Sequence, residues 1–256
     1  MFPSGVVTVS ALPAASKVLT VFRNIAPPPA PSQQNAAAVW GSNYQLVYHV
    51  ADNAANATVA DSTGQLNGAN QANTSTKHVS GEIAGALTFN GSSDYIQAST
   101  SKAPPDQVTL EIWYNPNSTA ACRPFGLGGA EMRLELYSTA GGAIRFYRTW
   151  TGTSPVWLSG NSNLTPTSSW TSVALTYDDS STGNAPALYI NGVSQPFGSA
   201  SPTGSPNDSL AAWRIGQANS QDFCDGLLDE TRVSNVVRPP DWIKTEYNNQ
   251  SSPNTL

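Results

Sequence analysis

The chain has 256 residues, of which only 11% are charged and 39% are hydrophobic. Twelve Lys and Arg stand against seventeen Asp and Glu, giving a net charge of -5 and no basic stripe that could follow a nucleic acid backbone. Twenty-three aromatic residues supply apolar area for a core, and no apolar run reaches the roughly 20 residues that span a bilayer. Nucleic acid binding, disorder and a membrane span are therefore set aside.

Residues 1–38 read as an appendage to a larger domain. The N-terminus lacks a positively charged region and is interrupted by a proline, which argues against a signal peptide. Two strand-like stretches, 5–10 and 18–23, precede a polyproline-like run that cannot lie inside a sheet. The sequence predicts a boundary here, with one domain over residues 39–256.

Short strand-like segments separated by turn signals follow the linker. The candidate strands are 45–50, 85–90, 94–98, 107–115, 131–138, 143–149, 170–178, 186–190 and 226–234. The pair Asn191-Gly192 is typical of a tight type I′ hairpin turn. One helix is predicted at about 239–248, where Pro239 and Pro240 can open the first turn. Many short strands with regular turns predict an all-β sandwich or jelly roll.

The cysteines leave two interpretations open. Cys122 and Cys224 permit one disulfide, as expected in an oxidising compartment. Two buried free thiols fit the spacing nearly as well. Neither residue lies in a C-x-x-C motif, so the sequence offers no redox site or zinc site.

A series of segments carries a family resemblance through its order along the chain. The segments are 40–50, 61–64, 85–96, 108–116, 170–177, 188–192, 214–216, 226–233 and 241–250. In this order they resemble the bacterial laminin-G-like modules of the concanavalin A-like lectin and glucanase superfamily. Residues 1–38 look like the last part of an uncharacterised β-domain often found upstream of such modules.

This resemblance implies an all-β, concanavalin A-like jelly-roll β-sandwich with one short C-terminal helix. It also implies an extracellular or periplasmic location, with the export signal outside this chain. Lectins, glucanases and polysaccharide lyases share the architecture, so the function has to be argued from the residues of the site.

The resemblance further implies a structural calcium ion. Many members hold calcium with one aspartate at the start of the last strand and with backbone carbonyls, which points here to Asp229. Asp94 and carbonyls of the 90–94 turn or near His49 are the expected partners. The alternative is that Asp229 caps backbone amides or pairs with an arginine, because a buried carboxylate needs a partner of some kind.

Catalytic motifs are incomplete. The laminarinase-type E-x-D-x-E becomes Glu131-x-Arg133-x-Glu135, whose end carboxylates would lie about 13 Å apart, too far for a retaining or inverting pair. Polysaccharide lyases use a Tyr or His base with Arg, Gln or Asn to neutralise the substrate. His49, His78, Arg145, Tyr147 and Arg148 are of suitable types, but the lyase strand motif is absent. The sequence favours a non-catalytic protein.

Aromatic residues give the clearest ligand-binding signal. One predicted loop brings together Tyr147, Arg148, Trp150 and Trp157. Sugar rings could stack on the aromatic faces there, and the arginine could donate hydrogen bonds to sugar hydroxyl groups. Packing of Trp150 and Trp157 into the core explains the same pattern equally well.

The sequence therefore favours a secreted, non-catalytic module, stabilised by calcium, that binds a polysaccharide or a cell-surface glycan. One alternative is an assembly protein that forms a homo-oligomer through the strands of residues 1–38, by β-augmentation. Another is a glycoside hydrolase or polysaccharide lyase of the same superfamily.

Overall fold

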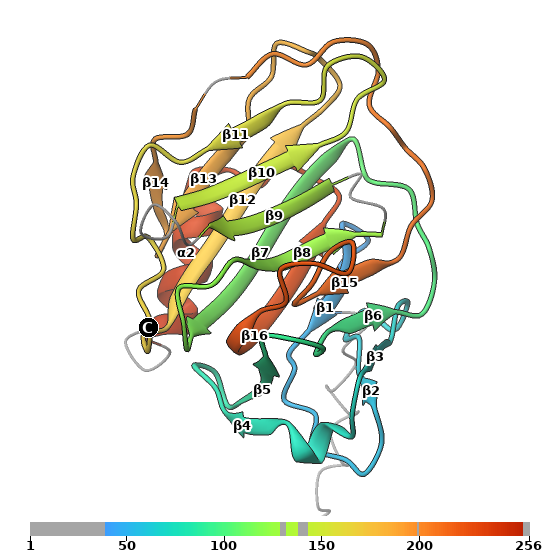
Figure 1. The fold of residues 1–256 in the computed structure, drawn as a ribbon, viewed down its shortest axis with the longest axis vertical. Helices are drawn as coiled ribbons and strands as arrows, with labels where there is room; N and C mark the ends of the chain where they lie inside the picture. Colours follow the sequence, from blue (N-terminus) through green and yellow to red (C-terminus); the bar gives the residue numbers. More distant parts are fainter. Residues whose placement is uncertain (1–38, 129–131, 138–142, 199, 253–256) are drawn as a thin grey trace, which may run out of the picture. The chain divides into compact units, whose positions relative to one another are not determined.

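The computed structural model describes residues 39–128, 132–137, 143–198 and 200–252. They form two antiparallel β-sheets and a C-terminal helix, α2 (Pro240–Ser251), which confirms the predicted jelly-roll sandwich (Figure 1). The boundary at residue 38 and the strand-like stretches before it lie outside the described residues and stay predictions. No helix in the described ranges combines the length and apolar character needed to cross a membrane.

Sheet A contains the longest strands. They are β1 (Tyr44–Tyr48), β4 (His78–Ser80), β5 (Gly85–Asn90), β7 (Gln107–Pro116), β12 (Thr171–Asp178), β13 (Ala187–Ile190), β14 (Val193–Gln195) and β16 (Asp225–Ser234). The order is β14-β13-β12-β7-β16-β5-β4. The first half of β16 pairs with β5, and its second half pairs with β1.

Sheet B is built from shorter strands. They are β2 (Thr58–Val59), β3 (Gly68–Asn70), β6 (Ile96–Ala98), β8 (Cys122–Leu127), β9 (Met132–Tyr137), β10 (Ala143–Arg148), β11 (Val156–Leu158) and β15 (Trp213–Ile215). The order is β11-β10-β9-β8-β15-β6-β3-β2, and the short 3-10 turn η1 (Thr74–Thr76) follows β3.

The core lies between the sheets because side chains alternate along each strand. On β10, Ile144 and Phe146 are fully buried, whereas Arg145 and Tyr147, which alternate with them, are half-buried on the opposite face. On β7, Leu110 and Ile112 belong to the same core. Each strand therefore contributes one apolar face to the interior and one face to the outside of the sandwich.

Helix α2 covers the outer face of sheet A. Ile243 packs against Ala174 and Tyr189, and the Tyr247 ring stacks on Trp113 with 5.7 Å between ring centroids. Figure 1 shows β8–β11 in front of β7 and β12, with α2 behind them. Sheet B has no such helix among the described residues, so the outward side chains of β9–β11 form a surface of the sandwich.

The predicted elements agree closely with the structure where patterns are strong. The hairpin turn is confirmed: Ile190 pairs with Val193, and Asn191 and Gly192 both have positive φ, as a type I′ turn requires. The sequence did not predict β8, in which Pro124 and Gly126 interrupt the strand pattern.

Candidate functional site

Three of the four residues predicted to bind ligand point away from solvent. Arg148 is fully buried, with Nε 2.5 Å from Asp179 Oδ2 and Nη2 2.5 Å from Asp208 Oδ1. Trp157 is also fully buried and packs on the rings of Phe146 and Tyr177. These two predictions are corrected, because neither side chain can contact a glycan without disrupting the core.

Trp150 is corrected on the same ground. Its side chain is only 4% exposed, and its backbone pairs with Pro206 in an isolated β-bridge. Tyr147 and Arg148 are the last two residues of β10, and the alternation of the strand sends Arg148 inward beside Phe146, while the connection to β11 follows at 149–155. The alternative interpretation, core packing, holds for both tryptophans.

Tyr147 lies on the outer face of sheet B, in a group that the strand register defines. Tyr147 is opposite Arg133 of β9 and Val156 of β11, and Arg145 is opposite Glu135 of β9 and Leu158 of β11. We call these six outward residues the β9–β11 platform. Val156 and Leu158, at the sheet edge, are 45% and 41% exposed. The platform thus has apolar side chains on the edge strand β11, and polar or charged side chains on β9 and β10.

Two arginines hold the Tyr147 ring. The guanidinium carbon of Arg133 lies 3.5 Å from the ring centroid, a cation–π contact, and Arg145 Nη1 donates to Tyr147 Oη at 3.3 Å. Arg133 Nε also lies 3.4 Å from Glu135 Oε2. The platform therefore offers guanidinium donors in a fixed arrangement beside exposed apolar side chains.

A loop between β15 and β16 borders the platform across β8. A Cβ placed on Gly126 would lie 2.2 Å from Ala218 Cβ, so residues 217–222, the ridge loop, rest directly on β8. Arg123 fixes this loop, because its Nη1 donates to Ala218 O at 2.9 Å and its Nη2 pairs with Asp222 Oδ2 at 2.6 Å. Three of the loop residues have positive φ, namely Asn219, Ser220 and Asp222.

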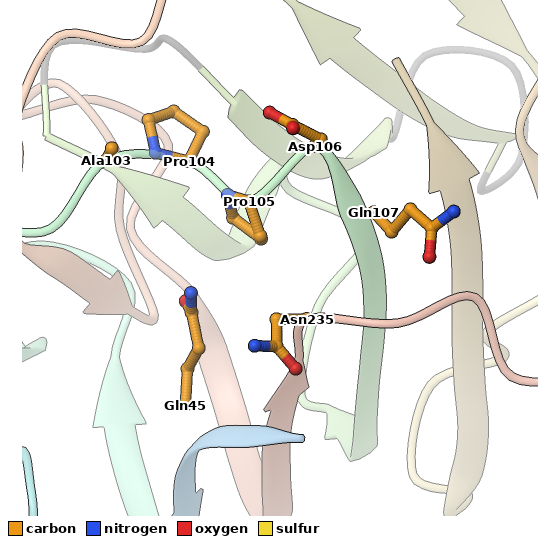
Figure 2. Close-up of a pocket in the computed structure, with 7 residues that line it drawn as sticks. All are labelled: Gln45, Ala103, Pro104, Pro105, Asp106, Gln107 and Asn235. Atoms are coloured by element: carbon orange, nitrogen blue, oxygen red, sulfur yellow. The ribbon is translucent and has the colours of Figure 1, made fainter. Parts of the chain in front are cut away.

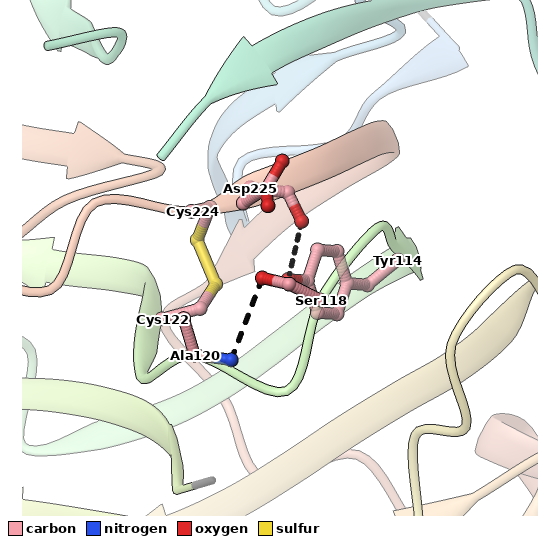
Figure 3. The surroundings of a disulfide bond; sticks show 6 residues. All are labelled: Tyr114, Ser118, Ala120, Cys122, Cys224 and Asp225. Carbon is pink, nitrogen blue, oxygen red and sulfur yellow. Dashed lines mark hydrogen bonds between the residues drawn. A yellow bond between two sulfur atoms is a disulfide. The ribbon is translucent and has the colours of Figure 1, made fainter. Parts of the chain in front are cut away.

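A disulfide anchors the end of the ridge loop. Cys122, the first residue of β8, is bonded to Cys224, which directly precedes β16, as Figure 3 shows. The bond decides the question that the sequence left open. It also ties the base of the ridge loop to the strand on which the loop rests.

The predicted catalytic motifs do not assemble in the described residues. Glu131 lies outside them, and Glu135 is 3% exposed and shared between Arg123 and Arg133. The two histidines belong to the other sheet: His78 begins β4, and His49 follows β1. They are therefore not brought together with Arg145 and Tyr147 as a lyase-type set.

His49 belongs instead to a partly buried ionic network beside sheet A. His49 Nδ1 lies 2.6 Å from Glu230 Oε1, and this hydrogen bond raises the pKa of His49. Glu230 also pairs with Arg232 and sits at a β-bulge with a φ of 46°. A pocket of about 530 Å³ lies beside these three residues. Their charges satisfy one another, which is typical of a structural network.

The expected metal ligands do not converge. Asp94 Oδ2 lies 2.6 Å from Lys77 Nζ, so one oxygen of this expected ligand is already paired with a cation. Asp94 lies four residues beyond Asn90, the last residue of β5. Asp229 lies nearer the start of that strand, because the adjacent Leu228 pairs with Leu87. Among the described residues no group of three or more His, Cys, Asp or Glu could hold a metal ion.

Asp229 by itself retains the character of a ligand. Its Oδ2 accepts the Ile83 amide at 2.8 Å, whereas its Oδ1 is buried with no hydrogen-bond partner. Burial raises the pKa of Asp229 to about 7. Gly81 leaves room beside it, since a Cβ there would lie 2.5 Å from Oδ2. One unpaired carboxylate oxygen fits calcium only if backbone carbonyls supply the remaining ligands.

A second surface pocket, of about 480 Å³, lies beside the start of β7 (Figure 2). Its lining residues are Gln45, Ala103, Pro104, Pro105, Asp106, Gln107 and Asn235. Amide groups dominate its polar lining, but no aromatic ring faces it, so it lacks a stacking surface of the kind that Tyr147 offers.

Comparison with known proteins identifies the family. Residues 90–244 match the concanavalin A-like lectin/glucanases superfamily. The chain belongs to this superfamily. The concanavalin A-like match covers β6 to β16 and the first turn of α2, and so includes the whole β9–β11 platform. No curated protein matches the chain by sequence.

Solved structures share the concanavalin A-like fold at low sequence identity. Domain 4 of AbnA, a GH43 extracellular arabinanase from Geobacillus stearothermophilus solved in complex with arabinotriose, is 20% identical, with a TM-score of 0.55 over 79% of this chain and 97% of that one. The receptor binding domain of botulinum neurotoxin type G is 14% identical, with a TM-score of 0.59 over 82% of this chain and 52% of that one. A pentraxin from Limulus polyphemus is 14% identical, with a TM-score of 0.51 over 65% of this chain and 81% of that one. At these identities the likeness establishes the fold alone.

Proposed function

We propose that this chain is a non-catalytic carbohydrate-binding module that holds a glycan on the β9–β11 platform. The observation that carries the proposal is the grouping of Tyr147, Arg133 and Arg145 beside the exposed Val156 and Leu158 on an outer sheet face. Apolar side chains can pack against the C–H faces of sugar rings, while guanidinium groups donate to hydroxyl oxygens. The arabinotriose complex of the structurally similar arabinanase domain is consistent with this class of ligand.

A binding role also accounts for the acids of this face better than catalysis does. Glu135 and Asp222 are both paired with Arg123, so within the described part of the face neither acid is poised as a nucleophile or proton donor. The disulfide supports an extracellular or periplasmic location, because such bonds persist in oxidising compartments. The assembly alternative depends on residues 1–38, which lie outside the described residues.

Tyr147→Ala is the direct test of the platform. We expect the wild-type chain to be retarded in gels that contain a bound polysaccharide, and Tyr147→Ala to lose at least tenfold in affinity, because the substitution removes the ring and the support for Arg133. Tyr95→Ala is the matched control: Tyr95 lies under Arg214 and directly precedes β6, which β15 and β8 separate from β9. Thermal unfolding of both variants verifies that they fold.

Two outcomes would contradict the proposal. One is the absence of binding to every member of a broad glycan array by the folded wild-type chain. The other is release of reducing ends or of unsaturated, ultraviolet-absorbing products from a polysaccharide panel, which would establish an enzyme instead.

We also propose that Asp229 provides the side-chain ligand of a structural calcium ion. Calcium would neutralise the buried carboxylate and satisfy its unpaired Oδ1. We expect calcium to raise the melting temperature of the wild-type chain relative to EGTA, and to have no effect on Asp229→Asn. Equal melting temperatures of the wild type with calcium and with EGTA would remove the metal from the proposal.

A further inference from the structure

The pocket beside His49 is built from four segments that lie far apart in the chain. The segment after β1 supplies His49 and Ala51, and the turn from β4 to β5 supplies Ile83 and Ala84. Strand β16 and the last turn of α2 complete the lining, and every lining residue belongs to the described ranges. The volume of about 530 Å³ is within the range of small-molecule sites.

Backbone strain is concentrated at this pocket. Val50, Ala84 and Glu230 have φ values of 47°, 61° and 46°, in the left-handed region that residues with a side chain seldom adopt. Ala84 and Glu230 line the pocket, and Val50 lies between two lining residues. Strained residues persist only where the surrounding structure holds them, and they cluster at binding and active sites.

The charged groups of the pocket are paired with one another. Glu230 accepts from His49 Nδ1 through Oε1 and from Arg232 Nη2 through Oε2, and Arg232 Nη1 donates to Glu246 of α2. The Trp40 ring packs against this group, 5.7 Å from the His49 ring and 5.0 Å from the guanidinium carbon of Arg232. Each charge thus has a counter-charge within the network, so the pocket offers no unpaired charge to an ionic ligand.

Other polar groups of the pocket keep hydrogen-bonding capacity. His49 uses only Nδ1 in the network, and 42% of its side chain is exposed, so Nε2 stays available. The side-chain amide of Asn249 makes no hydrogen bond to a described residue. Arg232 Nε is buried, again with no hydrogen-bond partner among the described residues. Beside these groups, Ala51 and Ile83 form an apolar wall.

We infer that this pocket is a second binding site, separate from the β9–β11 platform, and that it holds one residue of a neutral sugar. The C–H face of the ring packs against Ala51 and Ile83, and the hydroxyl groups exchange hydrogen bonds with the Asn249 amide and His49 Nε2. An amide presents a donor and an acceptor side by side, which suits two neighbouring hydroxyls. The site is built on sheet A and α2, whereas the platform belongs to sheet B, so neither depends on the other.

NMR of the histidine rings observes this site directly, because the chain has only two histidines. His78→Gln assigns the two imidazole signals. The probes are glucose, galactose and mannose, each compared with its uronic acid, in which a carboxylate replaces the hydroxymethyl group. We expect at least one neutral sugar to shift the His49 signal until it saturates, and to bind tenfold or more tightly than its uronic acid, because the carboxylate meets no unpaired cation.

Two pairs of variants then locate the contact. We expect Asn249→Ala to weaken sugar binding about tenfold, because it removes a donor and an acceptor together. Asn248→Ala is its matched control, since Asn248 is exposed on the same helix and does not line the pocket. Ala51→Leu should abolish binding by filling the pocket, whereas Ala55→Leu, exposed on the same loop, should leave binding unchanged. Melting temperatures check that each variant is folded.

Three outcomes would overturn the inference. The first is the absence of a saturable His49 shift with every sugar; it leaves the β9–β11 platform standing, because retention by polysaccharide gels tests the platform. The second is equal affinity for a neutral sugar and its uronic acid, which would refute the neutral ligand class. The third is an equal loss in Asn249→Ala and Asn248→Ala, or loss of the shift in Tyr147→Ala, which would place the bound sugar elsewhere.

Discussion

At the scale of single residues, neighbours on one strand have opposite roles. Tyr147 reaches the outer face of sheet B, whereas Arg148, the next residue, is fully buried in ion pairs with Asp179 and Asp208. In the sequence both residues belong to one aromatic segment. The structure shows that they are the last two residues of β10. Because side chains alternate along a strand, Tyr147 and Arg148 point to opposite faces of sheet B.

Two buried acids make the stability of the fold depend on pH. Burial raises the pKa of Asp229 to about 7. Burial also raises the pKa of Glu111 to about 7, although the nearby charge of Arg232 acts to lower it. The ordinary values are 3.8 and 4.5, so the folded chain holds these protons more strongly than the unfolded chain does. Their contribution to stability is complete below about pH 4 and is lost as the pH rises through about 7.

Asp229→Asn tests this dependence in urea unfolding with EGTA present. Asparagine keeps the shape and cannot ionise, so we expect the wild type to lose stability relative to Asp229→Asn between pH 4 and 7, by at most a few kcal/mol. Glu111→Gln should act in the same direction. Asp178→Asn is the control, because hydrogen bonds from Ser180 lower the pKa of that exposed carboxyl. Parallel stability curves for the wild type and Asp229→Asn would contradict the prediction.

At the scale of elements, the ridge loop shows how distant segments shape the face of sheet B. It joins β15 to β16, yet it lies on β8, where Gly126 leaves space for Ala218. The sequence gives no local signal for this contact, because the loop and the strand lie about 90 residues apart. The disulfide between Cys122 and Cys224 connects the two segments covalently across 102 residues.

Removal of the disulfide should therefore destabilise the fold. We expect the Cys122→Ala/Cys224→Ala variant to lose about 2–5 kcal/mol of unfolding free energy, because the crosslink restricts a long loop in the unfolded chain. Urea unfolding with and without dithiothreitol measures the loss: the reductant should lower the stability of the wild type and leave the variant unchanged. Equal stability of the wild type and the variant in oxidising buffer would argue against a structural bond.

At the scale of the whole molecule, the covering of one sheet decides where a ligand can approach. Helix α2 packs on sheet A through Ile243 and Tyr247, so the outward side chains that it contacts on β7, β12 and β13 are enclosed. In the described part of sheet B, the ridge loop covers β8, and outward side chains of β11 such as Val156 and Leu158 are exposed. The concanavalin A-like family is shared with proteins of several functions, and this difference between the faces is what directs the proposal to sheet B.

The sequence by itself determined the strands with strong patterns, such as β5 and β7, the hairpin at Asn191-Gly192, the C-terminal helix and the sandwich class. Alternation and turn chemistry are local properties, and they carry this information. Only the tertiary structure decided which aromatic side chains lie on the outer face of sheet B and that Asp94 pairs with Lys77. It also decided that four arginines lie on the same face of sheet B. Those facts depend on which strands become neighbours and on what covers each sheet, and contacts between residues far apart in the chain fix both.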